Sequence, residues 1–127
     1  MKAALTVWEN RISPVFDVSR EALIVEIKDH LVVSREQFKI SGRTALDKIS
    51  WLKHKDVEAL ICGAISESLY RELRFHQMSV NGFVVGAVEE VIHAFVHGTL
   101  GDERFLMPGC RRLQSGGRRR NRIRMGG

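Results

Sequence analysis

The chain has 127 residues, of which 44% are hydrophobic and 28% are charged. This length fits one domain with a substantial core but not two, and the composition is typical of a soluble globular protein. The most apolar window, ALICGAI, is far shorter than a membrane-spanning helix, and the apolar part of MKAALTVWENR is too short for a signal peptide. We therefore expect a cytoplasmic protein without a transmembrane segment.

The net charge of +5 is unevenly distributed along the chain. Residues 1–110 contain 13 lysines and arginines against 15 acidic residues, whereas residues 111–127 contain seven arginines and no acidic residue. The basic character therefore belongs to the tail. Because the tail is also rich in glycine and lacks apolar periodicity, we predict one domain over 1–110 and a disordered arm over 111–127.

The first part of the chain predicts three strands. KAALTVW (2–8) is a short apolar run that ends at the loop ENRISP, which is typical of a buried strand. ALIVEIK (22–28) and LVVSREQFKI (31–40) are further β-rich runs, and the two residues between them indicate a hairpin. These features predict an antiparallel meander.

The following part alternates helices and strands. The predicted elements are a helix of about three turns that includes Ala45, Leu46, Ile49 and Leu52, a strand over 57–62, a helix from Ser66 to about His76, a strand over 78–85 and a helix over 87–98. Ser66 is a suitable N-cap for its helix. Gly98 is a suitable C-terminal stop for the last helix.

The order β-β-β-α-β-α-β-α predicts a mixed five-stranded sheet with a ribonuclease H-like topology. In this topology the first, fourth and fifth strands run parallel, and their carboxyl ends share one edge of the sheet, where ligands usually bind. We therefore expect the loop ENRISPVFD and the turns CGAIS and VVGAV to meet at that edge.

Four short motifs occur in a characteristic order. They are ISPVFD after the first strand, LICGAIS at the fourth strand, GAVEEVIHAF at the last helix and RFLMPGC before the tail. Over roughly residues 2–110 this combination resembles the dinitrogenase iron–molybdenum cofactor biosynthesis family. The resemblance implies a small carrier that binds an iron–sulfur precursor or the finished iron–molybdenum cluster, with metallocluster donor and acceptor proteins as partners.

The chain departs from this family pattern at one position. In the nitrogenase-associated branch the loop after the first strand typically has a histidine just before the phenylalanine, and that histidine is implicated in holding the cluster. This chain has Val15 before Phe16. Because valine cannot ligate a metal, the resemblance does not extend to this ligand, and binding of the finished molybdenum cofactor does not follow from it.

Cys62 is the first candidate metal ligand. Thiolate is the preferred ligand of iron in sulfur clusters, and the end of the strand over 57–62 is expected to present Cys62 toward the loops. A lone thiolate cannot assemble a cluster from free iron, but it can hold a preformed one whose other positions are satisfied elsewhere. The alternative is that Cys62 is a small buried residue and that Cys62-Gly63 permits a tight turn.

The turn and the loop at the same edge supply the candidate cofactor-binding residues. Backbone amides near Gly63 and Ser66, at a helix N-terminus, attract anions such as a thiolate-bound cluster; the alternative for Ser66 is an ordinary N-cap. Ser13, Phe16 and Asp17 form the other wall. We expect Phe16 to pack back on the sheet and Asp17 to cap the following turn, so the position of the loop matters more than direct ligation.

Two further sets of ligand-type residues lie elsewhere. His93 and His97 share a helical face with Glu89, a spacing that can chelate zinc or nickel, but this face lies opposite the apolar stripe and is expected to be solvated. Cys110 follows Pro108-Gly109 and is either an inert exposed cysteine or a mobile thiol that delivers iron, bridges two chains or joins Cys62 as a second ligand.

Three classes of function are open. The first is a metallocluster carrier or chaperone. The second is a nuclease, but the runs KAALTVW and VEALIC place no carboxylate near the centre of a strand, as two-metal cleavage requires. The third is a non-catalytic module whose arginine tail contacts nucleic acid or an acidic protein. No catalytic triad, P-loop or dinucleotide fingerprint is present, so we expect no enzymatic activity.

Overall fold

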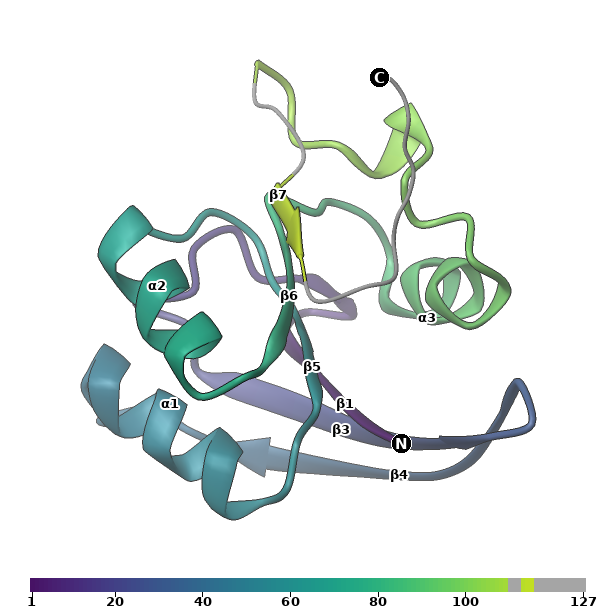
Figure 1. Cartoon of the computed structure of the whole chain (residues 1–127). Coiled ribbons are helices and arrows are strands. Elements are labelled where there is room, and N and C mark those ends of the chain that lie inside the picture. The colour runs from purple at the N-terminus through teal and green to yellow at the C-terminus, as the bar shows by residue number, and fades with distance from the viewer. Residues whose placement is uncertain (110–112, 116–127) are drawn as a thin grey trace.

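The computed structural model describes residues 1–109 and 113–115. Its elements are β1 (Lys2–Trp8), β2 (Arg11–Ile12), β3 (Glu21–Lys28), β4 (Leu31–Lys39), α1 (Ala45–His54), β5 (Ala59–Ile61), α2 (Glu67–Phe75), β6 (Ser79–Gly82), α3 (Val88–His97), a 3-10 turn (Glu103–Phe105) and β7 (Leu113–Ser115) (Figure 1). The mixed α/β class that the sequence predicts is confirmed. Within the described residues, no helix is both long enough and apolar enough to cross a membrane.

The strands form one sheet in the order β4-β3-β1-β5-β6-β7, and β2 pairs with β1 beside this path. As predicted, β1, β5 and β6 run parallel, while β3 and β4 are antiparallel neighbours. The hairpin between β3 and β4 turns at Asp29 and His30, whose φ angles of 52° and 64° match a two-residue turn that follows the twist of the strands. The short strands β2 and β7 were not predicted.

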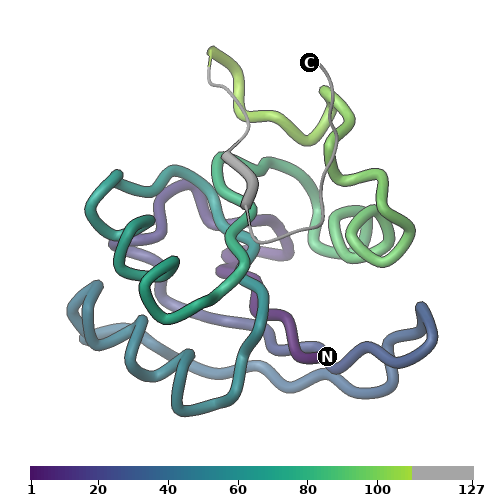
Figure 2. Tube along the Cα trace, viewed as in Figure 1, coloured from purple at the N-terminus to yellow at the C-terminus, as the bar shows by residue number. Residues whose placement is uncertain are grey.

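Helices cover both faces of the sheet. α1 and α2 lie on one face and α3 lies on the other (Figures 1 and 2). Because side chains alternate along a strand, β1 contributes Ala3, Leu5 and Val7 to the core under α3 and Ala4 to the core under α1 and α2. The domain therefore has two apolar layers separated by the sheet.

The two ends of the parallel strands differ in which helix ends they face. We call the end where β1, β5 and β6 finish the carboxyl edge, and the end where they begin the amino edge. Each helix starts near the carboxyl edge and returns toward the amino edge, since it connects or follows strands that run in the same direction. Thr44 and Ser66 cap α1 and α2, and Gly98, with a φ of 74°, ends α3.

β7 lies in the segment for which the sequence predicts disorder. It pairs antiparallel with β6, with Ser115 opposite Val80 and Leu113 opposite Gly82. The structure therefore differs from the predicted disorder at residues 113–115, because the outer side of β6 offers unpaired backbone groups to a further strand. Cys110, residues 111–112 and residues 116–127 lie outside the described residues.

Candidate functional site

The predicted segments meet at the carboxyl edge, where main-chain hydrogen bonds join them. The amide of Phe16 donates to the carbonyl of Ala64 (2.9 Å), and the amide of Ala64 donates to the carbonyl of Pro14 (2.8 Å). The amide of Ile12 donates in turn to the carbonyl of Gly86 (3.0 Å). The expected convergence is confirmed, and the loops close the edge much as additional short strands would.

Gly63 is required by the close approach of the first loop. A Cβ atom at this position would lie 2.4 Å from the carbonyl oxygens of both Ser13 and Pro14. No side chain larger than hydrogen fits at such a distance without moving the loop or β5. Gly63 therefore terminates β5 because the loop lies directly on its backbone, and this accounts for the cysteine–glycine pair at the end of the strand.

The residues of the loop divide between the core and the surface. The side chain of Phe16 is fully buried, which confirms that it packs back on the sheet, and Ser13 is also buried. Asp17 is exposed, as is Val15, whose side chain is 38% exposed at the position where the family resemblance places a histidine. Val18 is 71% exposed. The outer surface of the loop is therefore partly apolar.

A buried lysine fixes the loop to α1. Lys48 is only 2% exposed, and its Nζ atom donates to the carbonyls of Phe16 (3.3 Å) and Asp17 (2.6 Å) and to the Oγ of Ser19 (3.5 Å). Ser19 Oγ donates in turn to the carbonyl of Phe16 (2.7 Å). Burial lowers the pKa of Lys48, and the nearby charge of Asp17 opposes this shift. The ammonium group gives the carbonyl of Asp17 a partner and adds a further donor to the carbonyl of Phe16, which also accepts from the amide of Ser19 (3.2 Å).

Sequence reasoning missed Lys48, although a signal was present. Lys48 follows Ala45 by three positions and precedes Leu52 by four, so it lies on the apolar stripe of α1. A charged residue within an apolar stripe is uncommon unless it is paired inside the protein. This position could therefore have been singled out as a candidate structural or functional residue.

Cys62 lies beneath the loop in the core under α1 and α2. Its side chain has no exposed surface, and burial, together with the charge of Asp17, raises the pKa of its thiol to about 12. The end of β5 does place Cys62 against the loop, as expected, but the thiol is not accessible there, because Phe16 belongs to the same buried cluster and the loop covers it. In this conformation Cys62 is a protonated core thiol, whereas an iron ligand must be a thiolate.

A polar group without a partner adjoins Cys62. Thr6 follows Leu5, which pairs with Ile61 in the parallel ladder, so Thr6 and Cys62 are neighbours in the same register. Thr6 is 1% exposed. Its Oγ1 is a buried polar atom that has no hydrogen-bond partner among the described residues. The space beneath the loop is therefore not uniformly apolar.

Ser66 lies at this edge with a structural role, whereas the predicted histidine ligands lie elsewhere. Ser66 caps α2 by accepting a hydrogen bond from the amide of Leu69 (3.3 Å). His93 and His97 are exposed and stack on each other with ring centroids 4.1 Å apart, which confirms the predicted solvated face. Glu89 is engaged by Arg35 through two hydrogen bonds of 2.7 and 2.9 Å. Within residues 1–109 and 113–115, no group of three or more ligand-type side chains forms a metal site.

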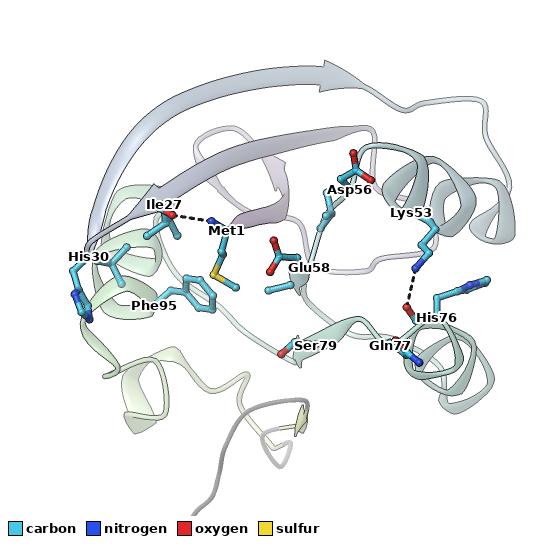
Figure 3. Close-up of a pocket in the computed structure, with 13 residues that line it drawn as sticks. Met1, Ile27, His30, Lys53, Asp56, Glu58, His76, Gln77, Ser79 and Phe95 are labelled. Carbon is cyan, nitrogen blue, oxygen red and sulfur yellow. Dashed lines mark hydrogen bonds between the residues drawn. The ribbon is translucent and has the colours of Figure 1, made fainter.

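The amino edge holds a large open cleft that the sequence did not predict. Its volume is about 1090 Å³, and its lining includes Met1, Lys53, Asp56, Glu58, Gln77 and Phe95 (Figure 3). These residues come from the start of the chain, from α1 and the segment after it, from the turn after α2 and from α3. No single motif encodes the cleft, because it forms only where these ends come together.

A mixed sheet covered by helices on both faces, with its loops closed over the carboxyl edge, defines a small α/β fold. The family model described as dinitrogenase iron-molybdenum cofactor matches residues 1–98. The chain therefore belongs to the dinitrogenase iron-molybdenum cofactor family. Among curated proteins, none matches the chain.

Solved structures include proteins similar to this chain. A Methanocaldococcus jannaschii protein, provisionally named a dinitrogenase, is 30% identical, with a TM-score of 0.63 over 78% of this chain and 90% of its own. The protein PH0822 is 22% identical, with a TM-score of 0.73 over 77% of this chain and 90% of its own. A Thermotoga protein, provisionally named NifB, is 21% identical, with a TM-score of 0.62 over 77% of this chain and 89% of its own. The last two show the fold alone.

Proposed function

We propose that the chain is a small, non-catalytic carrier that holds an iron–sulfur or iron–molybdenum cofactor precursor during metallocluster assembly in the cytoplasm. Family membership over residues 1–98 carries this proposal. The name of the M. jannaschii relative supports it, since it relates a similar chain to nitrogenase. The partners would be a protein that donates the cluster and another that accepts it.

The proposed cargo is a preformed cluster. The described residues supply one thiol, Cys62, and no complete set of ligands, so they do not fit a resident metal centre. A role for Cys62 as a ligand requires the loop to move, which breaks the contacts of Lys48 with Phe16 and Asp17. Cys110 remains the second proposed ligand and lies outside the described residues. The remaining positions of the cluster would be filled by the donor, the acceptor or small molecules.

The cofactor-binding residues in this proposal are Ser13, Phe16, Asp17, Gly63 and Ser66. The N-terminus of α2 lies next to Gly63, and its amides favour a negatively charged cargo. Ser13 and Phe16 are buried, so they would act by shaping the loop rather than by direct contact. Asp17 and Ser66 are exposed and are the members of this set that a cargo outside the closed loop can reach.

We further propose that the sheet is of the ribonuclease H-like type. The strand order β4-β3-β1-β5-β6, with its antiparallel start and parallel continuation, supports this assignment. A nuclease activity does not follow, because β1 and β5 contain no acidic residue and topology alone does not confer activity. No comparison supports the alternative that the chain is a binding module for nucleic acid or an acidic protein.

Anaerobic transfer from a loaded donor protein tests the carrier proposal. The full chain should acquire iron and sulfide in a fixed ratio, together with the visible absorbance of the cluster. Cys62→Ala should retain far less cluster, while His93→Ala, on the solvated face of α3, should match the wild type. Val15→His should increase retention, because this exposed position would add an imidazole ligand.

Circular dichroism on each variant separates loss of a ligand from loss of the fold. Failure of the wild-type chain to take up any cluster would reject the carrier proposal. Full loading of a folded Cys62→Ala variant would reject Cys62 as a ligand and leave the carrier proposal to depend on the surface of the loop.

A further inference from the structure

The amino-edge cleft lies at the C-terminal ends of all three described helices. Lys53 lies in the last turn of α1, Gln77 follows α2 and Phe95 lies near the end of α3, and all three line the cleft. The C-terminal end of a helix carries a partial negative charge, because its last carbonyls have no partners within the helix. The ends of these helices therefore favour positive charge in the cleft.

Two carboxylates add to this negative field. In Figure 3, Glu58 lies between the group formed by Met1 and Phe95 and the group formed by Lys53 and Gln77. Asp56 is two residues earlier in the chain. Among the described residues, no hydrogen bond or ion pair engages either carboxylate. Both are free to pair with a cation that enters the cleft.

The cations of the cleft itself are already engaged by main-chain carbonyls. Lys53 Nζ donates to the carbonyl of His76 (3.3 Å), and the terminal ammonium of Met1 donates to the carbonyl of Ile27 (2.8 Å). The side chains of Met1 and Phe95 provide apolar surface beside Glu58 (Figure 3). Apolar surface next to a carboxylate suits arginine, whose methylene stem packs on such groups while its guanidinium forms a two-pronged ion pair.

The described end of β7 lies beside this cleft. β7 runs antiparallel to β6, and its last residue, Ser115, lies opposite Val80. The chain therefore leaves β7 one residue from Ser79, which lines the cleft. The twelve residues that follow, 116–127, contain five arginines and no acidic residue. At ~3.3 Å per residue, this segment is long enough to cross the whole cleft.

We propose that residues 116–127 dock in the amino-edge cleft of their own chain, where arginine side chains pair with Asp56 and Glu58. Charge complementarity selects this occupant, and the exit of the chain at Ser115 makes the contact intramolecular. The proposal assigns the arginine tail a partner within the protein and does not depend on the carrier function.

Paramagnetic relaxation in the full chain tests the location of the segment. Gly126→Cys in a Cys110→Ser background carries a nitroxide label, and Cys62 is left unlabelled because it is buried. The amide signals of Glu58, Gln77 and Phe95 should lose most of their intensity. Broadening confined to the carboxyl edge, or no broadening, would overturn the proposal. In a mixture of labelled chain with isotope-enriched unlabelled chain, broadening of the enriched copy would show docking on a second copy and would also overturn it.

Trypsin cleavage of the same full-length chain measures the role of the two carboxylates. Asp56→Asn with Glu58→Gln should accelerate cleavage after the arginines of 116–127 about fivefold, because the lost ion pairs release the segment. The matched control is Glu9→Gln with Glu90→Gln, two exposed carboxylates that do not line the cleft, and its cleavage rate should equal that of the wild type. Equal rates for the cleft variant and the control would contradict the assignment of Asp56 and Glu58.

Discussion

The two edges of the sheet are built in opposite ways. At the carboxyl edge, main-chain hydrogen bonds join the loops to one another, the helices present their N-termini, and Gly63 and Lys48 hold the first loop against β5 and α1. At the amino edge, the helices present their C-termini to an open cleft lined by charged and apolar side chains. One edge therefore depends on backbone contacts that tolerate little change, and the other depends on side chains that can change freely.

This difference qualifies the rule that ligands bind at the carboxyl ends of parallel strands. The rule places the convergence of the loops correctly. It does not say whether the convergence is open, and here Phe16 and the loop cover Cys62. Access to this edge must come from movement of the loop, whereas access to the amino edge requires none.

The largest expected effect is at Gly63. Gly63→Ala places a Cβ atom 2.4 Å from two main-chain oxygens, so the loop must move or β5 must shift, and we expect a loss of about 3 kcal/mol in the free energy of unfolding. Urea denaturation measures this loss. The matched control is Gly101→Ala, since nothing lies within 4 Å of a Cβ atom there, and it should cost less than about 0.5 kcal/mol. Equal stabilities of the two variants would show that the close contact at Gly63 does not limit the fold.

The next effect is at Lys48. Lys48→Met keeps a long apolar stem but removes the ammonium, so the carbonyl of Asp17 loses its 2.6 Å bond and the carbonyl of Phe16 keeps only the donors of Ser19. We expect destabilisation of about 2 kcal/mol, again from urea denaturation. Lys39→Met changes an exposed lysine on β4 and should stay near the wild type. A Lys48→Met variant as stable as this control would show that the loop does not need the ammonium group.

A smaller effect concerns the pH dependence of stability. The thiol of Cys62 has its pKa raised from 9.0 to about 12 on folding, so the folded state holds the proton more tightly, and stability is lost as the pH rises through this window. Between pH 8 and pH 10 the loss from this group should be about 1 kcal/mol. Cys62→Ala removes this contribution, so its stability should fall less over the same range. Parallel curves for the two proteins would contradict the burial of the thiol.

The smallest effect is expected at the amino edge, and with the opposite sign. In a full-length background whose five arginines in 116–127 are replaced by glutamine, the two carboxylates have no tail arginine to pair with. There, Asp56→Asn with Glu58→Gln removes negative charge from the C-terminal ends of the helices, which should stabilise the fold by up to about 0.5 kcal/mol. Asn also tolerates the left-handed backbone at Asp56, whose φ is 62°. Thermal denaturation at low salt measures the change. A clear destabilisation in this background would mean that the two carboxylates have structural partners other than the tail arginines, and that the amino edge tolerates as little change as the carboxyl edge.

Much of the fold could be predicted from the sequence because apolar periodicity and capping residues act locally. KAALTVW and AVEEVIHAFVHG fall within one residue of β1 and α3, and Ser66 is the N-cap of α2. β6 is shorter than predicted because Phe83 adopts a positive φ of 59° and its amide donates to the carbonyl of Gly63. This contact joins residues far apart in the chain, so no local pattern announces it.

The sequence predicts where the candidate site lies, but not that the loop is closed over it. The loops around Ser13, Gly63 and Ser66 lie at the expected edge, because strand direction fixes that geometry. The burial of Cys62 and the role of Lys48 depend on how the loop folds over the strand end, and only the tertiary structure defines this. The amino-edge cleft, built from the ends of several elements, has no counterpart in any single sequence motif.

The reaction of Cys62 with a thiol reagent tests the closed carboxyl edge most directly. In a full-length Cys110→Ser background, Cys62 should react with Ellman's reagent only as fast as the protein unfolds, because the thiol is buried and protonated. Lys48→Met should accelerate the reaction at least about tenfold, while Lys39→Met should leave it unchanged. Reaction of the wild-type thiol at the rate of an exposed cysteine, under conditions in which the chain stays folded, would contradict the account.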